Sequence, residues 1–185
     1  VRHHAVLGHG LAVQAIRARG RSDIKVGFAE NPQVAVPILD TPDHIAAAEA
    51  WTREDNAPFL TVMLEGAYTD AYRDHPDAPA FTDEELTAIG SALDFVGINV
   101  YRPTVYVESD DDSGGPRVVA INASHPKMKS GWHILDPEVL YWAPRQVQSL
   151  WDAQWIYINE NGCAAEDVVA EDGRVYDSDR VSYLR

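Results

Sequence analysis

Hydrophobic and polar positions along the chain follow two periods, a helical one of about 3.6 residues and a strand period of two. Residues 4–18 have apolar side chains at helical spacing before a polar break that contains glycine, which predicts an amphipathic surface helix. Three runs of β-formers predict strands, at residues 25–29, 95–101 and 155–160. Two further helices are predicted, at residues 41–51 and from residue 82, because each begins with Thr and nearby acidic residues, which is typical of a helix N-terminus. Strands that alternate with helices favour parallel βα units over an all-β sandwich.

Two other regions have weaker patterns. Residues 57–72 are expected to be helical despite Thr61 and Val62, and a Pro-rich loop follows at 75–81. Residues 104–107 and 118–121 predict two short strands, joined by an acidic glycine loop at 110–115. Clustered aspartates would suit calcium, but the loop lacks EF-hand spacing and a distal glutamate, so a solvated hairpin tip is expected.

The strand at 155–160 ends on a carboxylate. The segment 155–162, W-I-Y-I-N-E-N-G, is broken by Asn161-Gly162 directly after Glu160. In parallel α/β barrels the carboxyl ends of the strands carry the chemistry. Glu160 is therefore a candidate nucleophile or general base, the alternative being a salt-bridged strand end.

The same segment resembles the nucleophile motif of glycoside hydrolase family 1, the β-glucosidases and β-galactosidases, whose usual form is I-T-E-N-G. Four more segments resemble family motifs in the same order: H-H-A to A-V at 3–13, D-F-V-G-I-N-V-Y at 94–101, G-W-H-I to P-E-V-L at 131–140, and D-R to Y-L at 179–184. The resemblance implies an α/β fold, the (β/α)8 TIM barrel. It implies an incomplete barrel, roughly from the helix after strand 4 through the region after strand 7. Residues 1–185 would belong to a single catalytic domain, with 104–131 as a hairpin excursion between strands 6 and 7.

The length conflicts with a closed barrel. A (β/α)8 barrel needs about 250 residues, whereas this chain has 185 and opens at Val1 within a helical pattern. We therefore expect an excerpt of a larger enzyme, with a compact 185-residue domain as the alternative. Unpaired strand edges should make the isolated chain unstable as a monomer, so the remainder of the barrel or a partner chain is expected to cover them.

Composition restricts the classes of partner. The formal charge of −14 opposes binding to nucleic acid, and no apolar run approaches 18 residues, so neither nucleic acid nor a membrane is expected as a partner. The compartment stays open, with a preference for the cytoplasm, because a signal on a missing N-terminus would not be visible. The single cysteine, Cys163, excludes an internal disulfide and is expected to be a half-buried thiol.

The resemblance also implies site residues. A retaining glycosidase uses two carboxylates about 5 to 5.5 Å apart, a nucleophile and an acid/base. Glu160 matches the nucleophile, and Tyr101 matches the tyrosine whose hydroxyl contacts it, which would favour the ionised form of Glu160. Asn99 resembles an active-site asparagine and points to the same side of its strand as Tyr101. Trp132 matches a tryptophan that lines the aglycone entrance, the alternative being plain packing at the rim. Catalysis is thus expected from Glu160 and Tyr101, and substrate binding from Asn99 and Trp132.

The acid/base has no matching residue. The family carries it in an Asn-Glu-Pro tripeptide, which is absent from this sequence. In Glu30-Asn31-Pro32 the order is scrambled, so Glu30 is interpreted as a strand-end residue near the pocket. The histidines His3, His4 and His9 lack an H-E-x-x-H pattern and are expected to pack within their helix rather than bind a metal. No dinucleotide or phosphate-loop motif occurs, so neither a metal nor a cofactor is expected.

The sequence thus predicts a β-glucosidase-like enzyme that hydrolyses terminal β-D-glycosides with retention, through a covalent glycosyl-enzyme. A β-linked glucoside or galactoside is the expected substrate, and the preference between the two stays open. The isolated chain is expected to be inactive, because it carries the nucleophile without the acid/base. The alternatives are a catalytically silent remnant or sugar-binding fragment, and a stand-alone interaction domain if the family match were coincidental.

Overall fold

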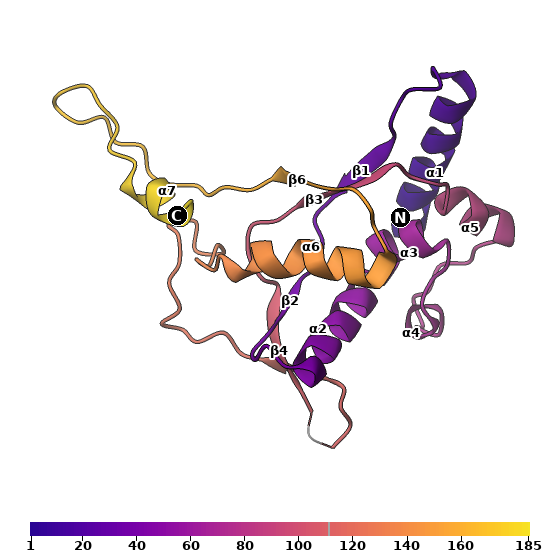
Figure 1. Cartoon of the computed structure of the whole chain (residues 1–185), viewed down its shortest axis with the longest axis horizontal. Coiled ribbons are helices and arrows are strands. Elements are labelled where there is room, and N and C mark those ends of the chain that lie inside the picture. Colours follow the sequence, from indigo (N-terminus) through magenta and orange to yellow (C-terminus); the bar gives the residue numbers. More distant parts are fainter. Residues whose placement is uncertain (111) are drawn as a thin grey trace.

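The computed structural model describes residues 1–110 and 112–185. Two three-stranded sheets lie among the helices (Figure 1). The first is parallel, with strand order β1-β3-β6, and comprises β1 (Gly27–Glu30), β3 (Phe95–Asn99) and β6 (Ile156–Glu160). The second has the order β2-β4-β5 and comprises β2 (Ala35–Pro37), β4 (Val105–Ser109) and β5 (Pro116–Val119). The predicted parallel βα arrangement is therefore confirmed for the first sheet.

Seven α-helices and one π-helical turn are seen in the described residues. They are α1 (Arg2–Arg19), α2 (Pro42–Asp55), η1 (Ala57–Thr61), α3 (Val62–Glu65), α4 (Asp70–Arg73), α5 (Asp83–Ile89), α6 (Glu138–Trp151) and α7 (Ser178–Tyr183). Helix α6 runs alongside the first sheet, and the C-terminal segment with α7 extends to the left in Figure 1. The capping box predicted at the start of α5 is present, because Thr82 Oγ1 accepts from Glu85 N and Glu85 Oε2 accepts from Thr82 N.

One face of β3 forms the main core. Its alternate residues Val96 and Ile98 are buried and pack with Leu60 of η1 and with Val139 and Val147 of α6. The opposite face is open. There Phe95 meets Tyr157 edge to face, with ring centroids 5.2 Å apart, beside a hollow of about 590 Å³. Because helices cover a single face, only side chains on the other face of β3 can take part in an open site.

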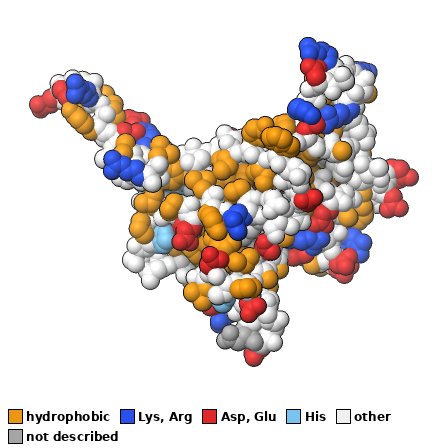
Figure 2. Space-filling view, in the orientation of Figure 1, with side chains coloured by type: hydrophobic (Ala, Val, Ile, Leu, Met, Phe, Trp, Pro, Cys, Tyr) orange, Lys and Arg blue, Asp and Glu red, His pale blue; other side chains and the backbone are white. Residues whose placement is uncertain are grey.

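The uncovered face is strongly apolar along β6 and the residue before it. Trp155 is 67% exposed and Tyr157 53% exposed, and hydrophobic side chains gather over this strand in Figure 2. In the described residues, β1 and β6 each pair with β3 alone and keep one free edge. An apolar, unpaired edge of this kind is a surface that proteins normally cover.

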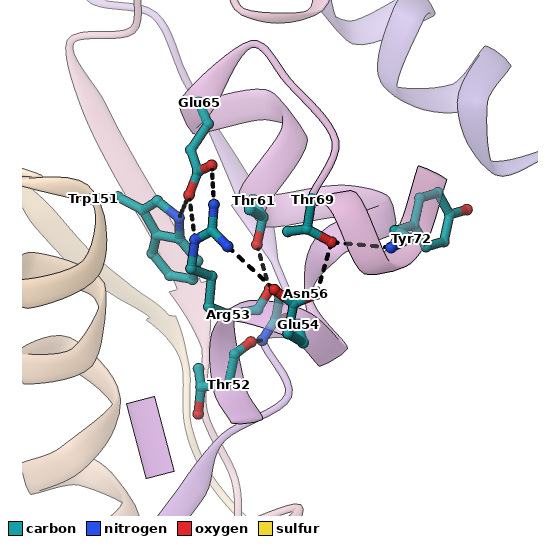
Figure 3. A network of polar contacts seen from close by, with 9 residues as sticks. All are labelled: Thr52, Arg53, Glu54, Asn56, Thr61, Glu65, Thr69, Tyr72 and Trp151. Carbon is teal, nitrogen blue, oxygen red and sulfur yellow. Dashed lines mark hydrogen bonds and ion pairs between the residues drawn. The ribbon is translucent and has the colours of Figure 1, made fainter. Parts of the chain in front are cut away.

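Polar contacts fix α6 against α2 and α3 (Figure 3). The Arg53 guanidinium donates two hydrogen bonds to the Glu65 carboxylate, at 2.8 and 2.6 Å, and Trp151 Nε1 donates to the same carboxylate at 3.2 Å. The pair is partly exposed, so its net contribution to stability is small. Its planar, bidentate geometry nevertheless sets the position of the C-terminal end of α6.

A second, buried contact connects α6 to the other sheet. The Gln146 amide donates to the Ala35 carbonyl at 2.7 Å and accepts from the Thr52 hydroxyl at 2.9 Å. Gln146 is 1% exposed, so both ends of its amide are satisfied inside the protein. Helix α6 therefore contacts the second sheet through Gln146 and the first through Val139 and Val147.

Three sequence-based expectations need correction. The continuous helix expected at 57–72 is broken, because Gly66 adopts a left-handed φ of 66° that ends α3, and Thr69 then caps the short helix α4. The side chain of Thr41, expected to cap α2, instead lies 2.9 Å from His44 Nδ1 and makes no backbone cap. Helix α6 and strand β2 are not among the predicted elements.

The sequence did contain a signal for α6. Its buried residues lie at helical spacing: Val139, Trp142, Ala143, Gln146 and Val147. Pro144 within this stretch argues against a helix, because proline removes a backbone donor and clashes with the preceding turn. Burial of the apolar face outweighs that local penalty.

Two glycines of α1 offer a test of the packing between α1 and α5. A Cβ added at Gly10 would lie 2.0 Å from the Ala88 carbonyl oxygen of α5, whereas nothing lies within 4 Å of one added at Gly8. Gly10→Ala should therefore destabilise the protein by about 1–3 kcal/mol, the usual cost of overpacking. Gly8→Ala should stabilise it by about 0.5–1 kcal/mol through helix propensity. Thermal melting of the full-length protein would measure both, and equal melting temperatures for the two variants would contradict the close approach of α1 and α5.

Candidate active site

The side of the sheet on which Glu160 lies is set by an irregularity in the pairing of β3 with β6. Strands β3 and β6 pair in regular register from Val96 with Ile156 to Ile98 with Ile158, and the register then shifts so that Asn99 pairs with Glu160. Side chains of paired residues in a parallel sheet lie on the same face. The shift therefore moves Glu160 off the helix-covered face of Ile156 and onto the open face shared by Asn99.

The predicted contact between Tyr101 and Glu160 is present. The Tyr101 hydroxyl donates a short hydrogen bond to Glu160 Oε2. This bond, together with partial desolvation and the charge of the carboxylate, raises the pKa of Tyr101 above its usual value. Tyr101 therefore stays a neutral donor across the ordinary pH range, and the bond restrains the Glu160 carboxylate to one position.

A set of hydrogen bonds holds the backbone beneath this pair. The Tyr101 carbonyl accepts from His133 Nε2 at 3.0 Å and from the Tyr183 hydroxyl at 3.1 Å. Asn161, directly after the nucleophile candidate, donates from Nδ2 to the Val100 carbonyl at 2.8 Å and to the Tyr183 hydroxyl at 2.9 Å. The ends of β3 and β6 are thus joined through α7.

Trp132 and Asn99 complete the group. Trp132 is 56% exposed and meets Tyr101 edge to face with centroids 6.2 Å apart, while the Arg102 guanidinium lies 5.9 Å from the indole centroid. An exposed, flat indole beside a carboxylate is a surface on which a sugar or aryl group can stack. The Asn99 amide oxygen is buried and has no hydrogen-bond partner within the described residues. The structure therefore brings all four predicted site residues together at one end of the parallel sheet.

Glu30 is the last residue of its strand, as predicted, but it does not lie on the face of the sheet that carries the candidate site. It ends β1 and pairs with Ile98, so it shares the helix-covered face of the sheet. Strand β3 separates it from β6, which puts the two backbones about 9–10 Å apart. Burial raises the pKa of Glu30, which would suit an acid. The position of Glu30 does not suit an acid/base, because the two carboxyl groups of a retaining enzyme must lie about 5 to 5.5 Å apart on the same side of the sheet.

Of the three histidines of α1 expected to pack, His3 and His9 do so, whereas His4 is exposed. His3 is buried, with Nδ1 3.0 Å from the Tyr68 hydroxyl and Nε2 3.5 Å from the Glu85 carboxylate. His9 meets Phe28 edge to face, and its burial lowers its pKa. In residues 1–110 and 112–185, no group of three or more His, Cys, Asp or Glu side chains is arranged to hold a metal ion.

Cys163 and the acidic loop have local explanations. Cys163 is a half-buried free thiol, as predicted, and its burial raises the thiol pKa, which disfavours the reactive thiolate. In the hairpin between β4 and β5, Asp110 Oδ1 accepts hydrogen bonds from the backbone N–H groups of Asp112 and Ser113, as in an Asx-turn. Asp111 of this loop lies outside the described residues. No helix in the described part of the chain has the length and apolar character to cross a membrane.

Comparison with known proteins identifies the family of the chain. The sequence profile described as Glycosyl hydrolase family 1 matches residues 1–185. The chain belongs to this family. The 1,4-beta-D-glucan glucohydrolase of Thermotoga neapolitana is 31% identical over 99% of this chain and 43% of its own length. Beta-glucosidase A of Thermotoga maritima is 31% identical over 99% of this chain and 41% of its own length.

The fold is also similar to that of solved β-glucosidase structures. The Thermotoga maritima β-glucosidase in complex with deoxynojirimycin is 29% identical, with a TM-score of 0.76 over 99% of this chain and 41% of that one. Its complex with azafagomine gives a TM-score of 0.75 at 30% identity, over 99% of this chain and 40% of that one. The α/β fold of this chain is therefore similar to part of the fold of these β-glucosidases. The chain spans about two fifths of the length of these relatives.

The residues that hold the Tyr101 backbone were not predicted from the sequence. Asn161 and Tyr183 belong to segments that resemble family motifs, so a signal for their positions was available. His133 also belongs to such a segment, at residues 131–140, but it was assigned no role there. The contacts of all three residues with Tyr101 or its neighbour could be seen only in the folded chain.

Proposed function

We propose that this chain supplies the nucleophile side of a retaining β-glycosidase of the β-glucosidase type. The observation that supports this best is the hydrogen bond from Tyr101 to Glu160 at the ends of β3 and β6, with Trp132 and Asn99 beside it. A carboxylate restrained by one donor, next to an open aromatic surface, suits attack on a bound sugar.

The chemistry would proceed in two displacements. One Glu160 oxygen attacks the anomeric carbon, the bond to the aglycone oxygen breaks, and a covalent glycosyl-enzyme forms. Water then attacks the same carbon and releases Glu160, so the configuration is retained. Tyr101 donates to the carboxylate oxygen that does not attack, which keeps the other oxygen aligned.

A second carboxylate must protonate the leaving oxygen and later activate water. Glu30 lies on the other face of the sheet, and the Asn-Glu-Pro tripeptide that carries this group in the family is absent from the sequence. We infer that the acid/base belongs to barrel strands outside these 185 residues. The same strands would cover the free edges of β1 and β6, with β1, β3 and β6 serving as barrel strands 5, 6 and 7.

The substrate class follows from the named relatives and from the site. The relatives are named as β-glucosidases and a glucan glucohydrolase, so we propose a terminal β-D-glucoside as substrate. Trp132 would lie against the aglycone, as its exposed indole can stack on the apolar face of a sugar or aryl group. A catalytically silent, sugar-binding remnant is the second candidate, favoured by the absence of the acid/base motif from these residues.

Covalent trapping tests the proposal. We expect a 2-deoxy-2-fluoro glucoside with a good leaving group to inactivate the full-length protein and to add one sugar. The fluorine slows both displacements, and the good leaving group keeps formation of the intermediate faster than its hydrolysis. Mass spectrometry of the digested protein should locate the sugar on Glu160. A sugar on another residue would overturn the assignment of the nucleophile, and binding without any covalent adduct would favour the silent remnant.

A further inference from the structure

His133 lies at the centre of an aromatic cluster below the candidate site, formed by Tyr101, Trp132, His133 and Tyr183. Its ring stacks on Trp132 with centroids 4.7 Å apart and planes at 20°. It meets Tyr183 and Tyr101 edge to face, at 5.0 and 6.1 Å. The side chain is 0% exposed. No role in the reaction described above uses this residue.

The protonation state of His133 follows from its partners. A carbonyl oxygen can only accept, so the 3.0 Å contact with Tyr101 requires the proton on His133 Nε2. Nδ1 is buried and has no hydrogen-bond partner among the residues that the structure describes. Burial lowers the pKa of His133 and outweighs the opposing effect of the hydrogen bond to Tyr101, while the Arg102 charge lowers the pKa further. The ring facing Tyr101, Tyr183 and Arg102 is therefore a neutral donor with a fixed tautomer.

We propose that His133 is a positioning residue of the candidate active site, which holds the Tyr101 backbone with its N–H and supports the Trp132 indole with its ring face. The inference rests on the proposed function. Tyr101 contacts Glu160 through its hydroxyl, and its own carbonyl is held by His133 and Tyr183. A shift of that carbonyl moves the phenol relative to the carboxylate. Trp132 is half exposed and has His133 as its stacked neighbour.

Two substitutions separate the two roles. His133→Phe keeps a ring against Trp132 but removes the donor to Tyr101, so kcat for an aryl β-glucoside should fall about three- to tenfold with little change in KM. His133→Gln retains an N–H donor of similar reach but removes the stacked ring, so KM should rise about three- to tenfold with kcat largely kept. A residue needed only for folding would show the same kinetic change in both variants.

A second measurement does not depend on activity. The phenolate absorbance of Tyr101, taken as the difference between each protein and its Tyr101→Phe counterpart, reports the contact with Glu160. In the wild type and in His133→Gln, ionisation should occur above the usual pH for tyrosine. In His133→Phe it should move back toward the usual value, because the phenol is no longer held against the carboxylate. If the wild type hydrolyses no glycoside, the proposed function fails while this titration still decides the role of His133.

Tyr183→Phe provides a check if His133→Phe does not fold. It removes the second donor to the Tyr101 carbonyl and keeps the ring, so it should move the Tyr101 ionisation in the same direction as His133→Phe. An unchanged Tyr101 titration in the folded variants that lack a donor would overturn the proposal. So would an identical fall in kcat at constant KM for His133→Phe and His133→Gln.

Discussion

Replacing Glu160 with glutamine should abolish nearly all turnover of an aryl β-glucoside by the full-length protein. Glutamine keeps the shape of the side chain but cannot form the glycosyl ester, so kcat should fall on the order of 10⁴-fold or more, the scale seen when a catalytic nucleophile is removed. The measurement is the steady-state release of the aryl alcohol.

The matched control for this variant is Glu30→Gln. Glu30 ends β1, two strands away from β6, and lies on the helix-covered face, so its loss should change kcat by less than about threefold, within the usual range for a residue away from the chemistry. A comparable loss in both variants would contradict the assignment of Glu160. Near-normal activity in Glu160→Gln would exclude it as the nucleophile.

Tyr101→Phe should produce the next largest effect. The substitution removes the hydrogen bond to the Glu160 carboxylate and leaves the ring packed against Trp132. A hydrogen bond to a charged group contributes about 1.5–3 kcal/mol, so kcat/KM should fall about 10- to 100-fold. Tyr176→Phe, which changes an exposed tyrosine of the C-terminal segment, should leave kcat/KM unchanged. Wild-type activity in Tyr101→Phe would show that the contact has no part in the reaction.

The same contact sets the sign of a pH effect. The Glu160 carboxylate raises the pKa of Tyr101, so the phenol keeps its proton to higher pH than an ordinary tyrosine. As pH rises through that raised pKa, the donor is lost and a phenolate faces the carboxylate. With an aryl β-glucoside whose leaving group needs no protonation, activity of the wild type should therefore decline as Tyr101 ionises, and this decline should be missing from the residual activity of Tyr101→Phe.

Several features of the fold were predictable from the sequence because they depend on residues close together in the chain. The helical spacing of α1, the capping box of α5 and the three strands of the parallel sheet all follow from local patterns. The order of five short motifs also indicated family 1 and singled out Glu160, Tyr101, Asn99 and Trp132. The local pattern was misleading at Gly66, where a single residue changes the backbone, and it gave no prediction of α6, in which burial overrides the penalty of Pro144.

The sequence by itself thus determined which residues end the strands and which of them resemble a glycosidase site. The tertiary structure decided which of them meet. Strict alternation would place Glu160 on the face of Ile156 and Ile158, and only the register shift against β3 turns it toward Asn99. The contact between Tyr101 and Glu160 joins residues 59 positions apart, and the one between His133 and Tyr101 joins residues 32 apart. Such contacts depend on how all the elements pack, which no local period encodes.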